Sequence, residues 1–345
     1  MKISICAGGT GGHMFPASAL FWAMQSKGHD VTLITDTRGE QFCQNISRKV
    51  ILDTVRFSKI NLVSNLFCLS KLFLKFIKMW KAESPDIVVG FGGSFTLAPL
   101  ISAKMFGAKV VICEQNIVVG KANSLLSHVA NLKLSAFNID HTWKQIAMPV
   151  RQEFSMFSKE YNCNDKIKIL VIGGSQGANS FGQIIPDALL KLDDESRKDI
   201  EIIQQVGHGN ALEIKQKYDN IGVKSTLLQF VDNVAEVMAD CQLVICRSGA
   251  STLSELVEMG RPAVLIPYPL ATNDHQYRNA MYYGNKNAAW VIKEDENSAA
   301  RLALVLNDVI RDRIKLKDVA KNIKSTKINC TVDDVIKIIE NTLEK

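Results

Sequence analysis

The chain has 345 residues, of which 47% are hydrophobic and 22% charged, so it can bury a large core and should contain no long disordered segment. Its length suggests two domains of roughly 150 residues each. The net charge of +6 is modest, and we expect no nucleic-acid partner. Eight cysteines without a Cys-x-x-Cys pair favour free thiols, with neither a disulfide nor a structural metal site.

No uncharged apolar stretch reaches the roughly 18 residues of a membrane span, and the segment before the first glycines is too short for a signal peptide. Residues 3–7 are the first predicted strand. Pro16 then indicates the start of a helix that ends at Gly28, and residues 31–35 form the next strand. Further strands are predicted at 86–90, 109–113, 167–172, 201–205, 243–246 and 263–266. This alternation predicts parallel sheets covered by helices on both faces.

Two glycine-rich loops open the two halves of the chain in the same way. GGTGGH, residues 8–13, follows strand 3–7, and GGSQGANS, residues 173–180, follows strand 167–172. Because Pro149 interrupts the chain between the two series, we predict an α/β protein with two doubly wound domains, 1–150 and 151–345. Ligands of such sheets bind at the carboxyl ends of the strands.

The loops do not match two common nucleotide-binding motifs. Met14 stands where the dinucleotide fingerprint needs its third glycine, and neither loop ends in the Gly-Lys-Ser/Thr of a Walker loop. GGSQG does fit the G-x-S-x-G elbow of serine hydrolases, and Asp240 and His275 follow it in the chain order of a triad. A hydrolase would leave the first glycine loop without a role, but it remains an alternative.

A third stretch, RSGASTLSE, follows strand 243–246 and opens a helix. The backbone N–H groups and the dipole at a helix start bind anions without a metal ion. Glu255 has two interpretations: a capping-box partner for Thr252, or a carboxylate that accepts hydrogen bonds from ribose hydroxyls. The chain contains no Asp-x-Asp pair, so we expect a diphosphate to be held by backbone, hydroxyls and dipole.

Eight pieces of the chain occur in the order found in one known family: GGTGGHMFP, FGGS, EQN, PVR, GGSQGA, FVDN, CRSGASTLSE and DHQYRNA. Together they resemble the MurG family of bacterial transferases. These enzymes move N-acetylglucosamine from UDP-N-acetylglucosamine to the lipid-linked muramyl pentapeptide of peptidoglycan synthesis, converting lipid I to lipid II. The resemblance implies a GT-B fold of two Rossmann-like domains facing a cleft, an inverting mechanism, no cofactor and no obligatory metal.

The resemblance also implies that 1–150 binds the acceptor and the membrane and that 151–345 binds the UDP-sugar, and it leaves open whether the last helix returns to the first domain. In the first domain it implies substrate contacts from Thr10, Gly11, Gly12 and Asn116. Around the donor it implies Arg151, Ser175, Val231, Ala250, Ser251, Thr252, Leu253, Ser254, Glu255 and Gln276. The chain departs from the family pattern at Ala147-Met148, usually Gly-Asn, and at Ser94, commonly tyrosine.

Glycosyl transfer needs a base, because the acceptor hydroxyl loses a proton as it attacks the anomeric carbon. His13, which follows the bare loop and titrates near neutrality, is the first candidate. Glu114 is the second, because it emerges at the carboxyl end of strand 109–113. A scaffold that keeps the transferase fold and the membrane contact without turnover is a further alternative, because a fold alone does not imply an activity.

The stretch 65–86 is predicted to form a helix with one lysine stripe and a wide apolar circumference. A helix that is buried except for its lysines is one interpretation. The other is a helix that dips into the cytoplasmic leaflet of the inner membrane, edged by Lys71, Lys75, Lys78 and Lys81. The family resemblance favours the second interpretation, and so predicts a peripheral enzyme on an anionic membrane surface.

Overall fold

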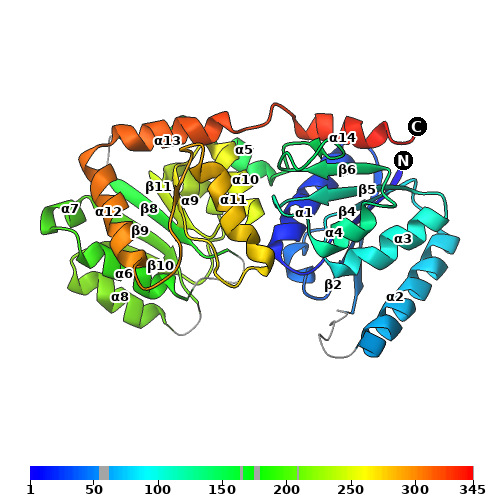
Figure 1. The fold of residues 1–345 in the computed structure, drawn as a ribbon, viewed down its shortest axis with the longest axis horizontal. Coiled ribbons are helices and arrows are strands. Elements are labelled where there is room, and N and C mark those ends of the chain that lie inside the picture. The colour runs from blue at the N-terminus through cyan, green and yellow to red at the C-terminus, as the bar shows by residue number, and fades with distance from the viewer. Residues whose placement is uncertain (54–61, 164–165, 175–178, 208–209, 345) are drawn as a thin grey trace. The chain divides into compact units, whose positions relative to one another are not determined.

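The computed structural model describes residues 1–53, 62–163, 166–174, 179–207 and 210–344, and of residues 62–69 it describes the backbone alone (Figure 1). The chain divides into two compact units. The first comprises Met1–Arg151 together with Ile328–Lys345, and the second comprises Gln152–Lys327. No helix within these described ranges is long and apolar enough to cross a membrane.

The first unit is built on a seven-stranded sheet in the order β3-β2-β1-β4-β5-β6-β7, in which every pair of neighbours is parallel. Its strands are β1 (Lys2–Cys6), β2 (Asp30–Asp36), β3 (Lys49–Leu52), β4 (Ile87–Gly90), β5 (Lys109–Glu114), β6 (Leu132–Ser135) and β7 (Lys144–Gln145). Successive side chains of a strand point to opposite faces, so Ile5 and Cys6 enter different cores.

Helices cover both faces of this sheet (Figure 1). One core contains side chains of α1 (Gly11–Ser26) and α14 (Val332–Glu340), and the other contains side chains of α2 (Leu62–Ala82), α3 (Leu97–Met105) and α4 (Lys121–Leu126). The 3₁₀ turns η1 (Glu40–Phe42) and η2 (Ser94–Thr96) lie in the loops after β2 and β4.

The last helix, α14, packs in the first unit although it ends the chain. Val335, Ile336 and Ile339 are buried in the same core as α1. A capping box between Thr331 and Asp334 fixes the start of the helix. Nε2 of His29 lies 2.9 Å from a carboxylate oxygen of Glu340, and an ion pair of 3.0 Å between Lys27 and Asp333 also joins the helix to the chain beyond α1.

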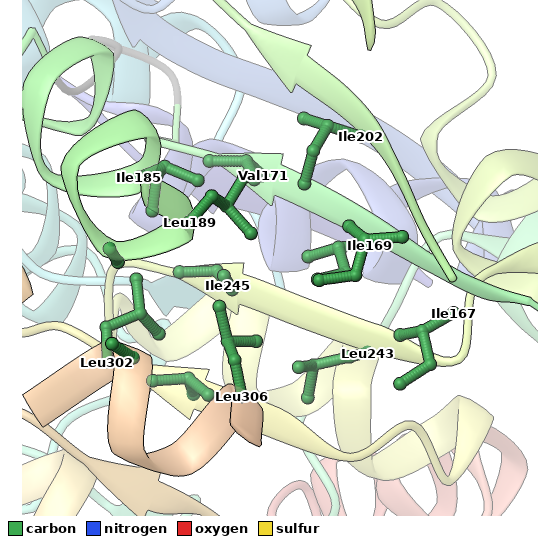
Figure 2. Packing of buried hydrophobic residues seen from close by; sticks show 14 of the residues in the cluster. Ile167, Ile169, Val171, Ile185, Leu189, Ile202, Leu243, Ile245, Leu302 and Leu306 are labelled. Carbon is green, nitrogen blue, oxygen red and sulfur yellow. The ribbon is translucent and has the colours of Figure 1, made fainter. Parts of the chain in front are cut away.

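The second unit repeats the plan with a six-stranded parallel sheet in the order β10-β9-β8-β11-β12-β13. Its strands are β8 (Ile167–Ile172), β9 (Ile200–Gln205), β10 (Lys224–Leu228), β11 (Leu243–Cys246), β12 (Ala263–Leu265) and β13 (Trp290–Val291). Alternate residues of β8 and β11 face the side chains of two helices in the core, where Ile185 and Leu189 meet Leu302 and Leu306 (Figure 2).

The helices of this unit are α5 (Gln152–Met156), α6 (Phe181–Leu190), α7 (Asp194–Lys198), α8 (Ala211–Asn220), α9 (Val234–Asp240), α10 (Ala250–Met259), α11 (His275–Gly284), α12 (Ser298–Arg311) and α13 (Ile314–Ser325), with the 3₁₀ turn η3 (Thr272–Asp274) before α11. Two doubly wound parallel sheets confirm the predicted α/β class. In both sheets the strand order reverses beside the first strand, between β1 and β4 and between β8 and β11, and ligands of this fold bind at that point.

The predicted start of the first helix was wrong. Helix α1 begins at Gly11, inside the glycine motif, and Pro16 lies within the helix. Pro16, the sixth residue of the helix, has no N–H to donate to Gly12 O, and the helix nevertheless continues to Ser26. The last two glycines of GGTGGH are therefore the first turn of a helix.

Candidate active site

The loops after β1 and β4 meet at the reversal point of the first sheet. Gly92 and Gly93 have φ values of +87° and +84°, a backbone conformation that other residues rarely adopt. A Cβ on Gly92 would lie 3.4 Å from Nε2 of His13, and one on Gly93 would lie 3.8 Å from its Nδ1. The FGGS motif therefore forms the wall against which the His13 ring lies.

His13 sits in the first turn of α1, half-buried, with Nδ1 3.1 Å from the main-chain oxygen of Gly8. A carbonyl oxygen only accepts hydrogen bonds, so Nδ1 carries the proton in this pair. In the neutral ring Nε2 is then the nitrogen that accepts a proton. The first turn of α1 thus directs Nε2 of His13 toward Gly92.

Glu114 ends β5 with its side chain buried at 2% exposure. Its Oε1 accepts from the main-chain N–H and the side-chain amide of Asn116 at 3.1 and 3.3 Å, and its Oε2 accepts from Gly120 N at 3.0 Å and Asn123 Nδ2 at 2.8 Å. These four hydrogen bonds fix the loop that follows β5 to both oxygens of the carboxylate. Asn123 also reaches within 3.4 Å of a Cβ placed on Gly92, so this loop borders the His13 site.

Thr10, Gly11 and Gly12 occupy the N-cap and the first two positions of α1. The sequence did not single out Asp36, which organises the same loop from the end of β2. The buried Asp36 carboxylate accepts from Gly9 N at 3.2 Å and is held by both Nε and Nη2 of Arg38, at 2.9 and 2.7 Å. An aspartate directly after the predicted strand 31–35 is the sequence signal from which Asp36 could have been identified.

Arg151 is the last residue of the first unit before α5, and its guanidinium carbon lies 4.5 Å from the centroid of the Phe15 ring of α1. Nearby, Met148 is buried in the core of the first unit, which accounts for an apolar residue at this departure from the family pattern. Ser94, the other departure, is exposed at the start of η2.

In the second unit, α10 begins at Ala250 with Gly249 as its N-cap, so the capping-box interpretation of Thr252 and Glu255 was wrong. Thr252 is already the third helical residue, and a capping residue must stand outside the helix. Glu255 lies in the second turn with only 5% of its surface exposed. Leu253 is buried, and the Ser254 hydroxyl donates to Ala250 O at 3.1 Å, while Ser251 is half-buried.

Gln276 stands in the first turn of α11, where its Oε1 accepts from Tyr268 N at 3.0 Å and its main-chain oxygen accepts from the Ser248 hydroxyl at 2.8 Å. The Ser248 bond connects the start of α11 to the residues before α10, and the Tyr268 bond connects it to the segment after β12. Val231, after β10, is buried. Ser175 lies outside the described residues.

Arg247 is the residue of this site that sequence reasoning missed, although it belongs to the motif CRSGASTLSE. Its guanidinium donates to Ile266 O at 3.1 Å, Pro267 O at 3.3 Å and the Ser180 hydroxyl at 3.1 Å, and it pairs with Glu294. The group lies 4.6 Å from the Phe181 ring centroid and 5.5 Å from that of Tyr268. Only 7% of Arg247 is exposed.

The geometry contradicts the serine hydrolase. Asp240 ends α9 just before β11 begins, so it lies at the amino end of the sheet, where its carboxylate pairs with Lys159. His275 begins α11, after the carboxyl end of β12, and its Nδ1 lies 2.8 Å from Thr272 O. The two side chains of the proposed triad therefore lie at opposite ends of the parallel strands, Asp240 at the amino ends and His275 at the carboxyl ends. Asp240 cannot orient His275 from there.

The thiols near the strand ends are buried, so they are not exposed to a substrate. Burial raises the pKa of Cys6 at the end of β1, of Cys113 in β5 and of Cys246 at the end of β11 far above that of a free thiol. Within the described ranges, no three His, Cys, Asp or Glu side chains gather as a metal ion would require.

Comparison with known proteins identifies both halves. Residues 3–133 match the glycosyltransferase family 28 N-terminal domain, and residues 168–334 match the glycosyltransferase family 28 C-terminal domain. A UDP-N-acetylglucosamine–N-acetylmuramyl-(pentapeptide) pyrophosphoryl-undecaprenol N-acetylglucosamine transferase of Paramagnetospirillum magneticum is 34% identical over 328 residues, 89% of this chain and 87% of that protein. The Rhodospirillum centenum protein of the same name is 35% identical over 335 residues, 92% of this chain and 88% of its own.

A solved structure agrees with these relatives. The crystal structure of MurG from Acinetobacter baumannii is 25% identical, covers 99% of this chain and 100% of its own, and superposes with a TM-score of 0.82. The two parallel sheets, the two family domains and this likeness give the chain the GT-B fold. The chain belongs to the MurG family of N-acetylglucosamine transferases.

Proposed function

We propose that the chain transfers N-acetylglucosamine from UDP-N-acetylglucosamine to undecaprenyl-pyrophosphoryl-N-acetylmuramyl pentapeptide, the step from lipid I to lipid II in peptidoglycan synthesis. The observation that carries this function is its likeness, over about nine-tenths of its length, to transferases named for this reaction. The oriented His13 at the reversal point of the first sheet supports it, because the reaction needs a base there.

The first unit binds the acceptor. Thr10, Gly11 and Gly12 form the start of α1. The helix dipole and the first-turn amides there favour binding of a diphosphate. Asn116, held by Glu114, offers its amide from the neighbouring loop. The Gly92-Gly93 turn, whose two residues have positive φ values, lies against the His13 ring and fixes its position.

His13 is the catalytic base of this account. As the acceptor hydroxyl attacks the anomeric carbon, its proton passes to Nε2, the C–O bond to UDP breaks, and UDP departs with the bonding electrons. One displacement inverts the configuration at that carbon. Glu114 is a positioning residue, because its two oxygens accept four N–H hydrogen bonds that hold the loop beside His13.

The second unit binds UDP-N-acetylglucosamine. The start of α10, with Ala250, Ser251 and Thr252, receives the diphosphate, as the loop containing Ser175 does in the family pattern. Glu255 accepts from the ribose hydroxyls, and its buried carboxylate gives that contact a low-dielectric setting. Leu253 and Val231 contribute backbone contacts, and Ser254, Gln276 and Arg151 complete the proposed set of donor contacts. No metal ion is required in this arrangement.

The first unit also carries the membrane contact. The lysine stripe, Lys71, Lys75, Lys78 and Lys81, is exposed along α2, and Leu74 beside it is 59% exposed. The opposite side of the helix, with Leu72, Phe76 and Trp80, is buried in the core, so part of the apolar circumference is structural.

The adjacent helix α3, which packs on α2, adds exposed apolar side chains at Ile101 and Met105, and Phe106 directly after it is also exposed. Apolar side chains edged by lysines suit the headgroup region of an anionic cytoplasmic leaflet, where the lipid-linked acceptor resides. We therefore assign the chain to the inner membrane as a peripheral enzyme.

The function is tested on the product itself. Incubation with UDP-N-acetylglucosamine and a lipid-linked muramyl pentapeptide should add one N-acetylhexosamine to the acceptor, as mass spectrometry measures. Nuclear magnetic resonance of the isolated product should show the β anomer, inverted relative to the α-linked donor. An α-linked product would contradict the single displacement, and an unmodified acceptor would favour the scaffold without turnover.

A further inference from the structure

One buried ion pair connects the carboxyl ends of four strands in the second unit. Arg247 follows β11 and bonds Ser180, which precedes α6 after β8, and Ile266 and Pro267, which follow β12. Its carboxylate partner, Glu294, comes after β13. The side chains of Arg247 and Glu294 are 8% and 18% exposed. We call this pair the clasp.

The clasp is continuous with the residues that frame the donor site. Arg247 directly precedes Ser248, whose hydroxyl bonds the main-chain oxygen of Gln276. The Gln276 side chain bonds Tyr268 N, and the Tyr268 ring lies against the Arg247 guanidinium. The contacts thus close a circuit through the loops after β11 and β12 and back to Arg247.

We propose that Glu294 is a positioning residue for the donor site, acting through Arg247 to hold Ser180 and the loops after β11 and β12 in the arrangement that receives UDP-N-acetylglucosamine. This inference rests on the proposed donor role of the second unit. A buried guanidinium needs a side-chain oxygen acceptor in contact, because a buried charge without acceptors is strongly unfavourable. Glu294 supplies it, and four protein oxygens then occupy the guanidinium and fix its plane.

Electrostatic repulsion alone predicts the opposite effect of Glu294 on UDP binding. A carboxylate near an anion-binding helix start repels a diphosphate, so its simple removal should tighten UDP binding. If Glu294 acts by holding Arg247, its removal should weaken binding instead. The two explanations therefore differ in sign, which makes the role measurable.

The test compares Glu294→Ala with Glu294→Gln in the full-length protein, using UDP titrated by calorimetry and initial rates at varied UDP-N-acetylglucosamine. The amide of glutamine keeps an oxygen that accepts from Arg247, and alanine keeps none. We expect Glu294→Ala to raise both the Kd for UDP and the KM for the donor about tenfold or more, because part of the cost of an unpaired buried cation appears as lost binding. We expect kcat to change less than about threefold, and Glu294→Gln to restore binding to within about threefold. Glu296→Ala, at an exposed acid two residues away, is the control and should bind like the wild type.

UDP binding by Glu294→Ala that equals or exceeds wild-type binding would overturn the inference. A lowered melting temperature with unchanged UDP binding would also overturn it, since the clasp would then be structural only. Absence of UDP binding by the wild type would instead contradict the proposed function, and the first titration shows this before any variant is made.

Discussion

His13 and Glu114, the two residues that the sequence offered as bases, have different surroundings in the fold. His13 has one ring nitrogen fixed on Gly8 O and the other toward the Gly92 turn. Glu114 is enclosed by N–H donors from Asn116, Gly120 and Asn123. The sequence placed His13 after the first glycine-rich loop and Glu114 at the end of a strand, but only the hydrogen bonds distinguish the proposed proton acceptor from the residue that holds a loop.

The role of His13 gives the first prediction. His13→Gln keeps a side-chain amide that can donate to Gly8 O but cannot take up a proton, so turnover should fall by about 10²- to 10⁴-fold while UDP binding is retained. Steady-state transfer rates measure the loss, and UDP titration measures the binding. The control is His141→Ala, at an exposed histidine, which should act like the wild type. A loss of turnover below about threefold in His13→Gln would show that another group or water accepts the proton.

Glu255 gives the second prediction. Its buried carboxylate in the second turn of α10 is the proposed contact for the ribose hydroxyls. Glu255→Ala should weaken UDP-N-acetylglucosamine binding by about 1.5–3 kcal/mol, the usual worth of hydrogen bonds to a charged group.

A UDP analogue without the ribose 2′ and 3′ hydroxyls is the matched control for Glu255. It should bind the wild type and Glu255→Ala about equally, because the contact is missing from both complexes. An equal loss for UDP and for the analogue would show that the variant disturbs the helix rather than the ribose contact.

At the scale of elements, the buried strands were readable because each is a short apolar run. The short strands β3, β6, β7, β10 and β13, all but β6 at sheet edges, were missed, since sequences such as KQ and KSTLL carry too few apolar residues for a periodic signal. The starts of α1 and α10 were also misplaced. In both, glycine and small residues beside a strand already adopt helical geometry because the helix packs on the sheet, so tertiary contacts override local propensity.

The lysine stripe on α2 gives the third prediction. Replacing Lys71, Lys75 and Lys78 with glutamate should abolish binding to anionic liposomes at low salt, since each lysine near such a surface contributes about 1 kcal/mol. Transfer to a membrane-embedded acceptor should fall with it, while transfer to a short-chain soluble acceptor stays unchanged. Sedimentation with liposomes and the two transfer assays measure these effects.

Helix α13 offers a matched control for the stripe. Lys317, Lys321 and Lys324 are exposed with the same spacing as the three α2 lysines, so their replacement with glutamate makes an equal change in net charge. This control should still sediment with liposomes. If both variants lose liposome binding equally, net charge rather than the α2 surface is responsible, and α2 is not the membrane contact.

At the scale of the whole molecule, the matching glycine loops indicated two similar halves, and the sheets have the same order of reversal. What the chain order could not show is which core receives the last helix. Helix α14 completes the first unit with Val335, Ile336 and Ile339, far in sequence from α1. Long-range packing of this kind leaves only an amphipathic pattern in the sequence, with no sign of its partner.

This packing gives the fourth prediction. Ile336→Ala should destabilise the first unit by roughly 2–4 kcal/mol, because it leaves a cavity in the core shared with α1. Urea unfolding followed by tryptophan fluorescence measures it, since Trp22, Trp80 and Trp143 all lie in the first unit. The control on the same helix, Val332→Ala, is 38% exposed and should change stability by less than about 0.5 kcal/mol. Equal effects of the two changes would contradict the packing of α14.

The central claim is that this chain is a transferase that needs both substrates and no metal ion. Release of UDP from UDP-N-acetylglucosamine, followed in EDTA with and without a lipid-linked muramyl pentapeptide, tests it most directly. We predict UDP release that requires the acceptor, matches the product mole for mole and persists in EDTA. UDP release without the acceptor, or none with it, would contradict the account.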